Sequence, residues 1–157
     1  MKTLRVWIIL SWIALPAGMF GGIFLLQRFL NHGDGPTPFQ MNWLRAGHAH
    51  GNVLVLMSLL YYTFLDQTSL SVSVKRAACV SLFVGILAQF GGFFLHAIVG
   101  QPNQASIGTA VTVFGAALLA GAVVVLIYGL ITTRSTTTAP DEFQPQIGSP
   151  VGGGIER

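Results

Sequence analysis

Four long apolar stretches constrain the fold of this chain more than any other feature. They cover residues 4–30, 43–65, 74–99 and 105–133. A helix needs about 20 mostly apolar residues to cross the hydrocarbon core of a bilayer, and each stretch reaches that length. Only 8% of the residues are charged, against roughly 25% in an average soluble domain. We therefore predict an all-α integral membrane protein, with one four-helix transmembrane bundle over residues 1–134 and the lipid bilayer as its surroundings.

The lysines and arginines in the short connections predict the orientation of these spans. Positive residues concentrate on the cytoplasmic side of membrane proteins. In the four-span arrangement, Lys2, Arg5, Lys75, Arg76 and Arg134 fall on one side, and Arg28 and Arg45 fall on the other. This predicts both termini in the cytoplasm and a location in the inner (cytoplasmic) membrane. The first apolar stretch exceeds the roughly 7–15 residues of a signal-peptide core, so we expect it to be a retained span.

The end of the chain differs in composition from the predicted bundle. Residues 135–157 are rich in Thr, Pro and Gly and poor in side chains that can pack, which predicts a disordered cytoplasmic tail. The net charge is +3, but the basic residues are scattered between apolar spans and form no patch. We therefore expect no nucleic-acid partner. Cys79 is the only cysteine, which excludes an internal disulfide and a CxxC site.

Small residues recur at every fourth position in two of the spans. They are Ala14, Gly18 and Gly22 in the first, and Gly108, Thr112, Ala116 and Ala120 in the fourth. Small side chains let membrane helices approach closely, so these stripes predict helix–helix contacts. The contacts can lie within the bundle, in a homo-oligomer, or against a larger respiratory or other membrane complex, and the sequence leaves these alternatives open.

The four histidines are predicted to lie in the same half of the membrane. His32 follows the first span, His48 and His50 open the second, and His96 closes the third, which places all four toward the outer side. Ionisable residues in membrane spans are costly and usually face the bundle interior or water. Residues two apart differ by about 200° around a helix. His48 and His50 therefore cannot both face one ligand on a regular helix.

Histidines on facing helices are a common means of holding haem or a transition metal in a helical bundle. Here the predicted pair is His50 or His48 together with His96. The cofactor is haem b or a transition-metal ion. Arg45 is a candidate partner for haem propionates, and His32 is a candidate third ligand for a bare metal ion such as zinc.

Two segments resemble a known family. "GGIFLLQRFL" from Gly21, followed by a short connection and "LRAGHAHGNVLVLM", resembles the first two helices of subunit I of the haem-copper oxidases. The resemblance implies that His50, in the matching position, ligates a low-spin haem near the outer face. That subunit has about twelve spans and further histidines for copper, so oxygen reduction by this chain alone is not expected. The chain also resembles small uncharacterised bacterial four-span membrane proteins.

Three functional hypotheses follow. The first is a protein that binds haem b or a transition metal in the outer half of the bundle, serving electron transfer, gas sensing or metal handling. The second is a non-enzymatic accessory subunit, whose histidines bind no ligand and form hydrogen bonds between helices. The third is a transporter or channel, which would require oligomerisation. No catalytic residues are predicted, because the sequence contains no G-x-S-x-G nucleophile motif.

Overall fold

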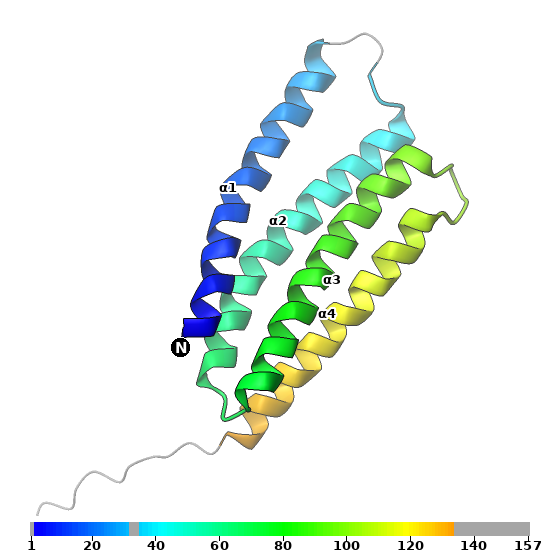
Figure 1. The fold of residues 1–157 in the computed structure, drawn as a ribbon. Coiled ribbons are helices and arrows are strands. Elements are labelled where there is room, and N and C mark those ends of the chain that lie inside the picture. The colour runs from blue at the N-terminus through cyan, green and yellow to red at the C-terminus, as the bar shows by residue number, and fades with distance from the viewer. Residues whose placement is uncertain (1, 32–34, 134–157) are drawn as a thin grey trace, which may run out of the picture.

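The computed structural model describes residues 2–31 and 35–133, and all regular structure within them is helical. The helices are α1 (Lys2–Asn31), α2 (Pro38–Gln67), α3 (Val72–Val99) and α4 (Ile107–Thr132). They run up and down in sequence order, so that consecutive helices are antiparallel (Figure 1). The predicted tail at 135–157 and His32 lie outside the described residues.

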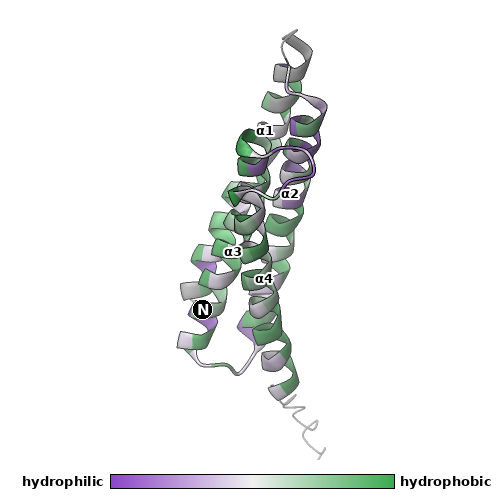
Figure 2. Cartoon of the chain, turned by 90° about the vertical axis from the view of Figure 1, so that its right-hand side faces the viewer, coloured by the Kyte–Doolittle hydropathy of each residue, from purple (hydrophilic) through white to green (hydrophobic). Residues whose placement is uncertain are grey.

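Three of the helices are long and apolar enough to cross a membrane: α1 over Leu4–Phe24, α3 over Val72–Val99 and α4 over Ile107–Thr132. The helix α2 does not meet this criterion, although it is 30 residues long. Its first half carries Arg45, His48, His50 and Asn52, which lower its average hydropathy. Figure 2 shows this pattern, with hydrophilic residues gathered in the upper part of α2 and hydrophobic residues over most of the other helices.

Helix α2 begins five residues earlier than the apolar pattern predicts, at Pro38 rather than residue 43. The cause is a capping box. The Thr37 hydroxyl accepts from the Gln40 backbone N–H, and the Gln40 side chain accepts from the Thr37 backbone N–H. Proline is well suited to the first helical position, because its missing N–H would have no partner there.

The bundle has two different ends. At the end we call the Asp66 end, α1 and α3 begin and α2 and α4 finish; the opposite end is the His96 end (Figure 1). The buried core lies toward the Asp66 end and contains Leu4, Tyr61, Tyr62, Leu65, Ala78, Cys79, Leu82, Ile86 and Ala122. Helix α1 packs mainly on α2 and touches α3 far less. A cavity therefore lies between α1 and α3, on the side of this core that faces the His96 end.

The tightest contact in the bundle joins α3 and α4. The buried residues of α4 are Gly108, Gly115, Ala122 and Gly129, one every seven residues. Within the bundle, the predicted four-residue stripe contacts α3 at Gly108 and Thr112, whereas Ala116 and Ala120 are exposed. A four-residue step advances about 40° beyond a full turn and leaves the contact line, whereas a seven-residue step drifts only about 20°.

Candidate functional site

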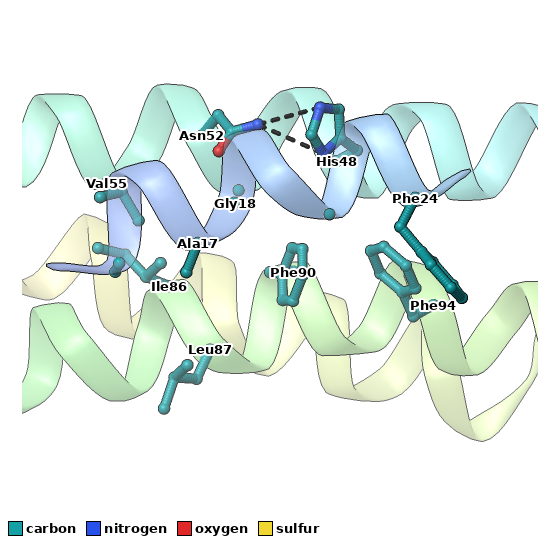
Figure 3. A pocket seen from close by; sticks show the side chains of 13 residues that line it. Ala17, Gly18, Phe24, His48, Asn52, Val55, Ile86, Leu87, Phe90 and Phe94 are labelled. Atoms are coloured by element: carbon teal, nitrogen blue, oxygen red, sulfur yellow. Dashed lines mark hydrogen bonds between the residues drawn. The ribbon is translucent and has the colours of Figure 1, made fainter. Parts of the chain in front are cut away.

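The predicted stripe on α1 forms a contact with the polar first half of α2. A Cβ on Gly22 would stand 2.6 Å from Nε2 of His48, and a Cβ on Gly18 would collide with the Asn52 amide. The two glycines thus provide notches for the two polar side chains. The Asn52 Nδ2 amide lies 3.2 Å from Nε2 and 3.3 Å from Nδ1 of His48, so it donates to the imidazole (Figure 3). The α1 stripe is therefore a helix contact within the bundle.

His48 and Asn52 border a cavity of about 450 Å³ between α1, α2 and α3, which we call the His48 pocket. Its described lining residues are Ala14, Ala17, Gly18, Gly21, Phe24, His48, Gly51, Asn52, Val55, Ile86, Leu87, Phe90 and Phe94. Figure 3 shows Phe90 and Phe94 on α3 opposite the glycine-rich side of α1. Among the described lining residues, His48 and Asn52 alone have polar side chains, and His48 alone is ionisable.

A second cavity lies against the same two polar residues. It has a volume of about 500 Å³ and is lined by Met19, Gly22, Ile23, Leu26, Arg45, His48 and Asn52. Arg45 is exposed and precedes His48 by three residues on α2, so the two side chains lie on the same part of the helix surface. A charged guanidinium thus lies one turn from the imidazole, toward the His96 end.

His50 faces away from His48, as the 200° separation predicts. Its ring lies against Phe93 of α3, with ring centroids 5.0 Å apart. Its Nδ1 lies 2.9 Å from the Ala46 carbonyl oxygen, so Nδ1–H donates within the helix. This bond leaves Nε2 as the nitrogen with a lone pair, which is the arrangement that metal-ligating histidines adopt.

His96 is enclosed at the junction of α2, α3 and α4. It is 3% exposed, and its Nδ1 lies 2.6 Å from the Ser106 hydroxyl and 3.3 Å from the Thr109 hydroxyl. Ser106 is the N-cap of α4 and forms a capping box with Thr109. The indole of Trp43 packs edge-on against the His96 ring, with centroids 4.2 Å apart. His96 therefore joins the end of α3 to the start of α4.

The three described histidines all lie toward the His96 end, but they do not meet at one point. His48 lines the pocket, whereas His50 and His96 do not. Within residues 2–31 and 35–133, no group of three or more His, Cys, Asp or Glu side chains is placed to hold a metal ion. His50 and His96 are connected instead through packed rings, in the order His50, Phe93, Trp43, His96.

Sequence reasoning places Asn52 near the His48 stripe of α2, but it did not predict the hydrogen bond between them and did not assign the α1 glycines to that imidazole. The signal for Asn52 was present, because residues four apart on a helix are neighbours. The partnership with Gly18 and Gly22 depends on the register between α1 and α2, which the sequence of either helix alone does not contain.

Comparison of the chain with models of protein families, with curated proteins and with solved structures gives no match. The resemblance to the haem-copper oxidases is therefore not supported by these comparisons, and the interpretation of the site rests on its geometry.

Proposed function

We propose that this chain is an integral protein of the inner (cytoplasmic) membrane, with four spans and cytoplasmic termini, that binds haem b in the His48 pocket. One observation carries the cofactor assignment: His48 is the single ionisable side chain among the described residues lining an apolar cavity of about 450 Å³. This volume falls within the range of roughly 300–1,000 Å³ that is common for cofactor sites.

The surface of α2 supports its assignment as the fourth span. Its large exposed hydrophobic side chains beyond the polar segment are Val53, Leu56, Met57, Leu60 and Phe64, and the exposed polar residues Asp66 and Gln67 lie at its end. The polar groups His48 and Asn52 face α1 instead. A helix with an apolar outer face and polar groups turned toward its neighbours suits a membrane bundle better than water.

The charge distribution supports the orientation. Arg5, Lys75 and Arg76 belong to the first turns of α1 and α3, at the Asp66 end, and Arg45 lies in the opposite half of α2. Under the positive-inside rule, the Asp66 end faces the cytoplasm.

The donor set favours haem over a bare transition-metal ion. Haem supplies four nitrogen ligands and needs only one or two from the protein, whereas the described residues offer no group of three metal ligands. When bound, haem would supply reversible one-electron chemistry. The Asn52 amide donates to the imidazole in this structure, so the same nitrogen lone pair would have to turn from Asn52 to the iron when haem binds. Phe90 and Phe94 form an apolar wall of the pocket, and Gly21, where a Cβ would meet nothing within 4 Å, leaves room for a flat ring. Arg45 would pair with carboxylates toward the His96 end.

The test compares two histidines that lie two residues apart on different faces of α2: His48, which lines the pocket, and His50, which does not. The protein is purified in detergent, titrated with haemin, and its visible spectrum is recorded oxidised and reduced, with metal analysis alongside. We expect a Soret band that is lost in His48→Ala and retained in His50→Ala. Loss of the band only in His50→Ala would assign the ligand that the family resemblance implies and overturn the pocket assignment. No haem binding by the wild type would overturn the haem proposal.

A second candidate function is a non-enzymatic accessory subunit of a larger membrane complex. The observation in its favour is that each described histidine already has a hydrogen-bonding partner, although only the His96–Ser106 bond joins two helices; His48 and His50 are bonded to Asn52 and Ala46 of α2 itself. This function predicts colourless, metal-free protein that copurifies with a membrane partner.

A further inference from the structure

Two positive side chains lie inside the apolar span of α3 rather than in the connection before it. The span covers Val72–Val99, so Lys75 and Arg76 belong to its beginning. At 1.5 Å per residue, they lie about 5–6 Å along the helix from the first residue of the span. When the apolar part of the helix occupies the hydrocarbon core, this level is that of the lipid headgroups. The two cations are therefore placed where lipid phosphates lie.

The same two cations line a small cavity at the Asp66 end of the bundle, which we call the Arg76 cavity. Its volume is about 130 Å³, which corresponds to about four waters at the roughly 30 Å³ that each occupies in the liquid. It therefore suits a compact group such as a phosphate. One side of the lining is charged and the other is apolar: the charged residues are Lys75, Arg76 and Asp66, and the apolar ones include Leu4, Leu70 and Val72.

The charges of the cavity favour an anion. Lys75 donates from Nζ to the backbone carbonyl of Asp66, at 3.0 Å, and this neutral acceptor leaves the ammonium with its full charge. Arg76 is exposed, and its planar guanidinium can bind a phosphate through two parallel hydrogen bonds. Two positive charges and the one negative charge of Asp66 leave a formal charge of +1 on the lining. A phosphodiester with an uncharged headgroup, which carries a single negative charge, complements it.

The other lining residues favour a phospholipid over a free phosphate ion. The Asp66 carboxylate repels a phosphate, but it can accept hydrogen bonds from headgroup hydroxyls. The apolar residues of the lining give a free phosphate nothing to bind. Val72 is 61% exposed at the start of its span, so the cavity borders surface that contacts lipid in a bilayer. A ligand with a phosphate, hydroxyls and acyl chains matches all three kinds of lining group.

We propose that the Arg76 cavity binds the phosphate of an anionic phospholipid of the phosphatidylglycerol class. Arg76 and Lys75 bind the phosphate, Asp66 accepts from the glycerol hydroxyls, and the acyl chains lie along the apolar surface that begins at Val72. Basic pockets between membrane helices are known to bind anionic headgroups. The site rests on the proposed location of the chain in a bilayer. It requires neither haem nor the His48 pocket, which shares no lining residue with it.

The experiment counts bound lipids by native mass spectrometry. The full chain in detergent is titrated with phosphatidylglycerol and, separately, with phosphatidylcholine, whose headgroup has no net charge. We expect one phosphatidylglycerol to bind about tenfold more tightly than phosphatidylcholine. Arg76→Gln should weaken phosphatidylglycerol binding by about tenfold, because it removes hydrogen bonds to a charged group. Arg76 is exposed, so the variant should fold, and its circular dichroism spectrum should match that of the wild type.

The matched control is Arg5→Gln, which removes the same charge at the same end of the bundle. Arg5 lines a neighbouring cavity of about 300 Å³ and not the Arg76 cavity. Its charge therefore acts only through solvent, and its removal should weaken binding by no more than about threefold. Equal weakening in the two variants would indicate a general attraction of anionic lipid to this end and would overturn the proposed site.

Two further results would overturn the proposal. One is equal affinity for the two lipids, which would remove the role of charge. The other is displacement of phosphatidylglycerol by an equal concentration of inorganic phosphate, which would assign the cavity to the free ion. None of these measurements depends on the Soret band, so failure of the lipid site is distinguishable from failure of the haem assignment.

Discussion

Two adjacent glycines of α3 offer a sharp test of the close contact between α3 and α4. A Cβ on Gly92 would stand 2.7 Å from the Gly108 carbonyl oxygen and 2.7 Å from the Thr112 backbone nitrogen. A Cβ on Gly91 would meet nothing within 4 Å. The variants Gly92→Ala and Gly91→Ala therefore add the same methyl group to neighbouring positions with opposite surroundings.

The expected effect of Gly92→Ala follows from those contacts. Ordinary Cβ contacts begin near 3.4 Å, so the new methyl is about 0.7 Å too close to the α4 backbone. Backbone atoms cannot rotate away as a side chain can, so the two helices must separate. Overpacking of this kind costs about 1–3 kcal/mol, and the His96–Ser106 hydrogen bond, if lost, adds about 1 kcal/mol. Gly91→Ala is expected to be neutral or to stabilise by up to about 1 kcal/mol, because alanine favours helix over glycine.

The assay is reversible unfolding in mixed detergent micelles with increasing SDS, followed by circular dichroism. The two variants should shift the unfolding midpoint in opposite directions, or Gly92→Ala alone should lower it. Equal shifts in both would refute the argument, because they would mean that the α3–α4 distance is not limited by backbone contact at Gly92.

Two further predictions concern the histidines. Ser106→Ala removes both the N-cap of α4 and the hydroxyl bonded to His96. The free energy of unfolding, measured in the same micelle assay, should therefore fall by about 1–2 kcal/mol. An unchanged midpoint would show that this cap does not contribute to the stability of the bundle. Gly22→Ala forces the His48 ring out of its notch and should weaken haemin binding by about tenfold or more, equivalent to about 1.4 kcal/mol, whereas Gly91→Ala, outside the pocket, should leave the titration curve unchanged.

The positions of the helices were predictable because apolar stretches of this length have few alternatives. The four predicted stretches agree with the four helices to within a few residues, except at the start of α2. There the apolar pattern gave no signal, because Gln40 and Asn42 are polar. The earlier start depends on Thr37 and Gln40 acting as a capping box, which is a local motif that hydropathy does not detect.

The separation of the histidines was predictable only in part. Helical geometry alone places His48 and His50 on different faces of α2, and the structure agrees. Which face meets α1 and which meets α3 depends on how the helices rotate about their axes, and that rotation is set by contacts between helices. The glycine notches at Gly18 and Gly22 determine it for α1 and α2.

The hydrogen bonding of His96 depends on the short connection between α3 and α4, which the helix pattern does not describe. Its stripe on α3 also contains Gly92, and the close approach that Gly92 permits brings the start of α4 against the last turn of α3. Only six residues, 101–106, separate α3 and its Gly100 cap from α4, so the Ser106 cap must lie near His96. An imidazole nitrogen beside a serine hydroxyl satisfies a group that would otherwise be buried without a partner. The same geometry turns His96 away from the His48 pocket, and this is why two histidines predicted to act together occupy separate sites.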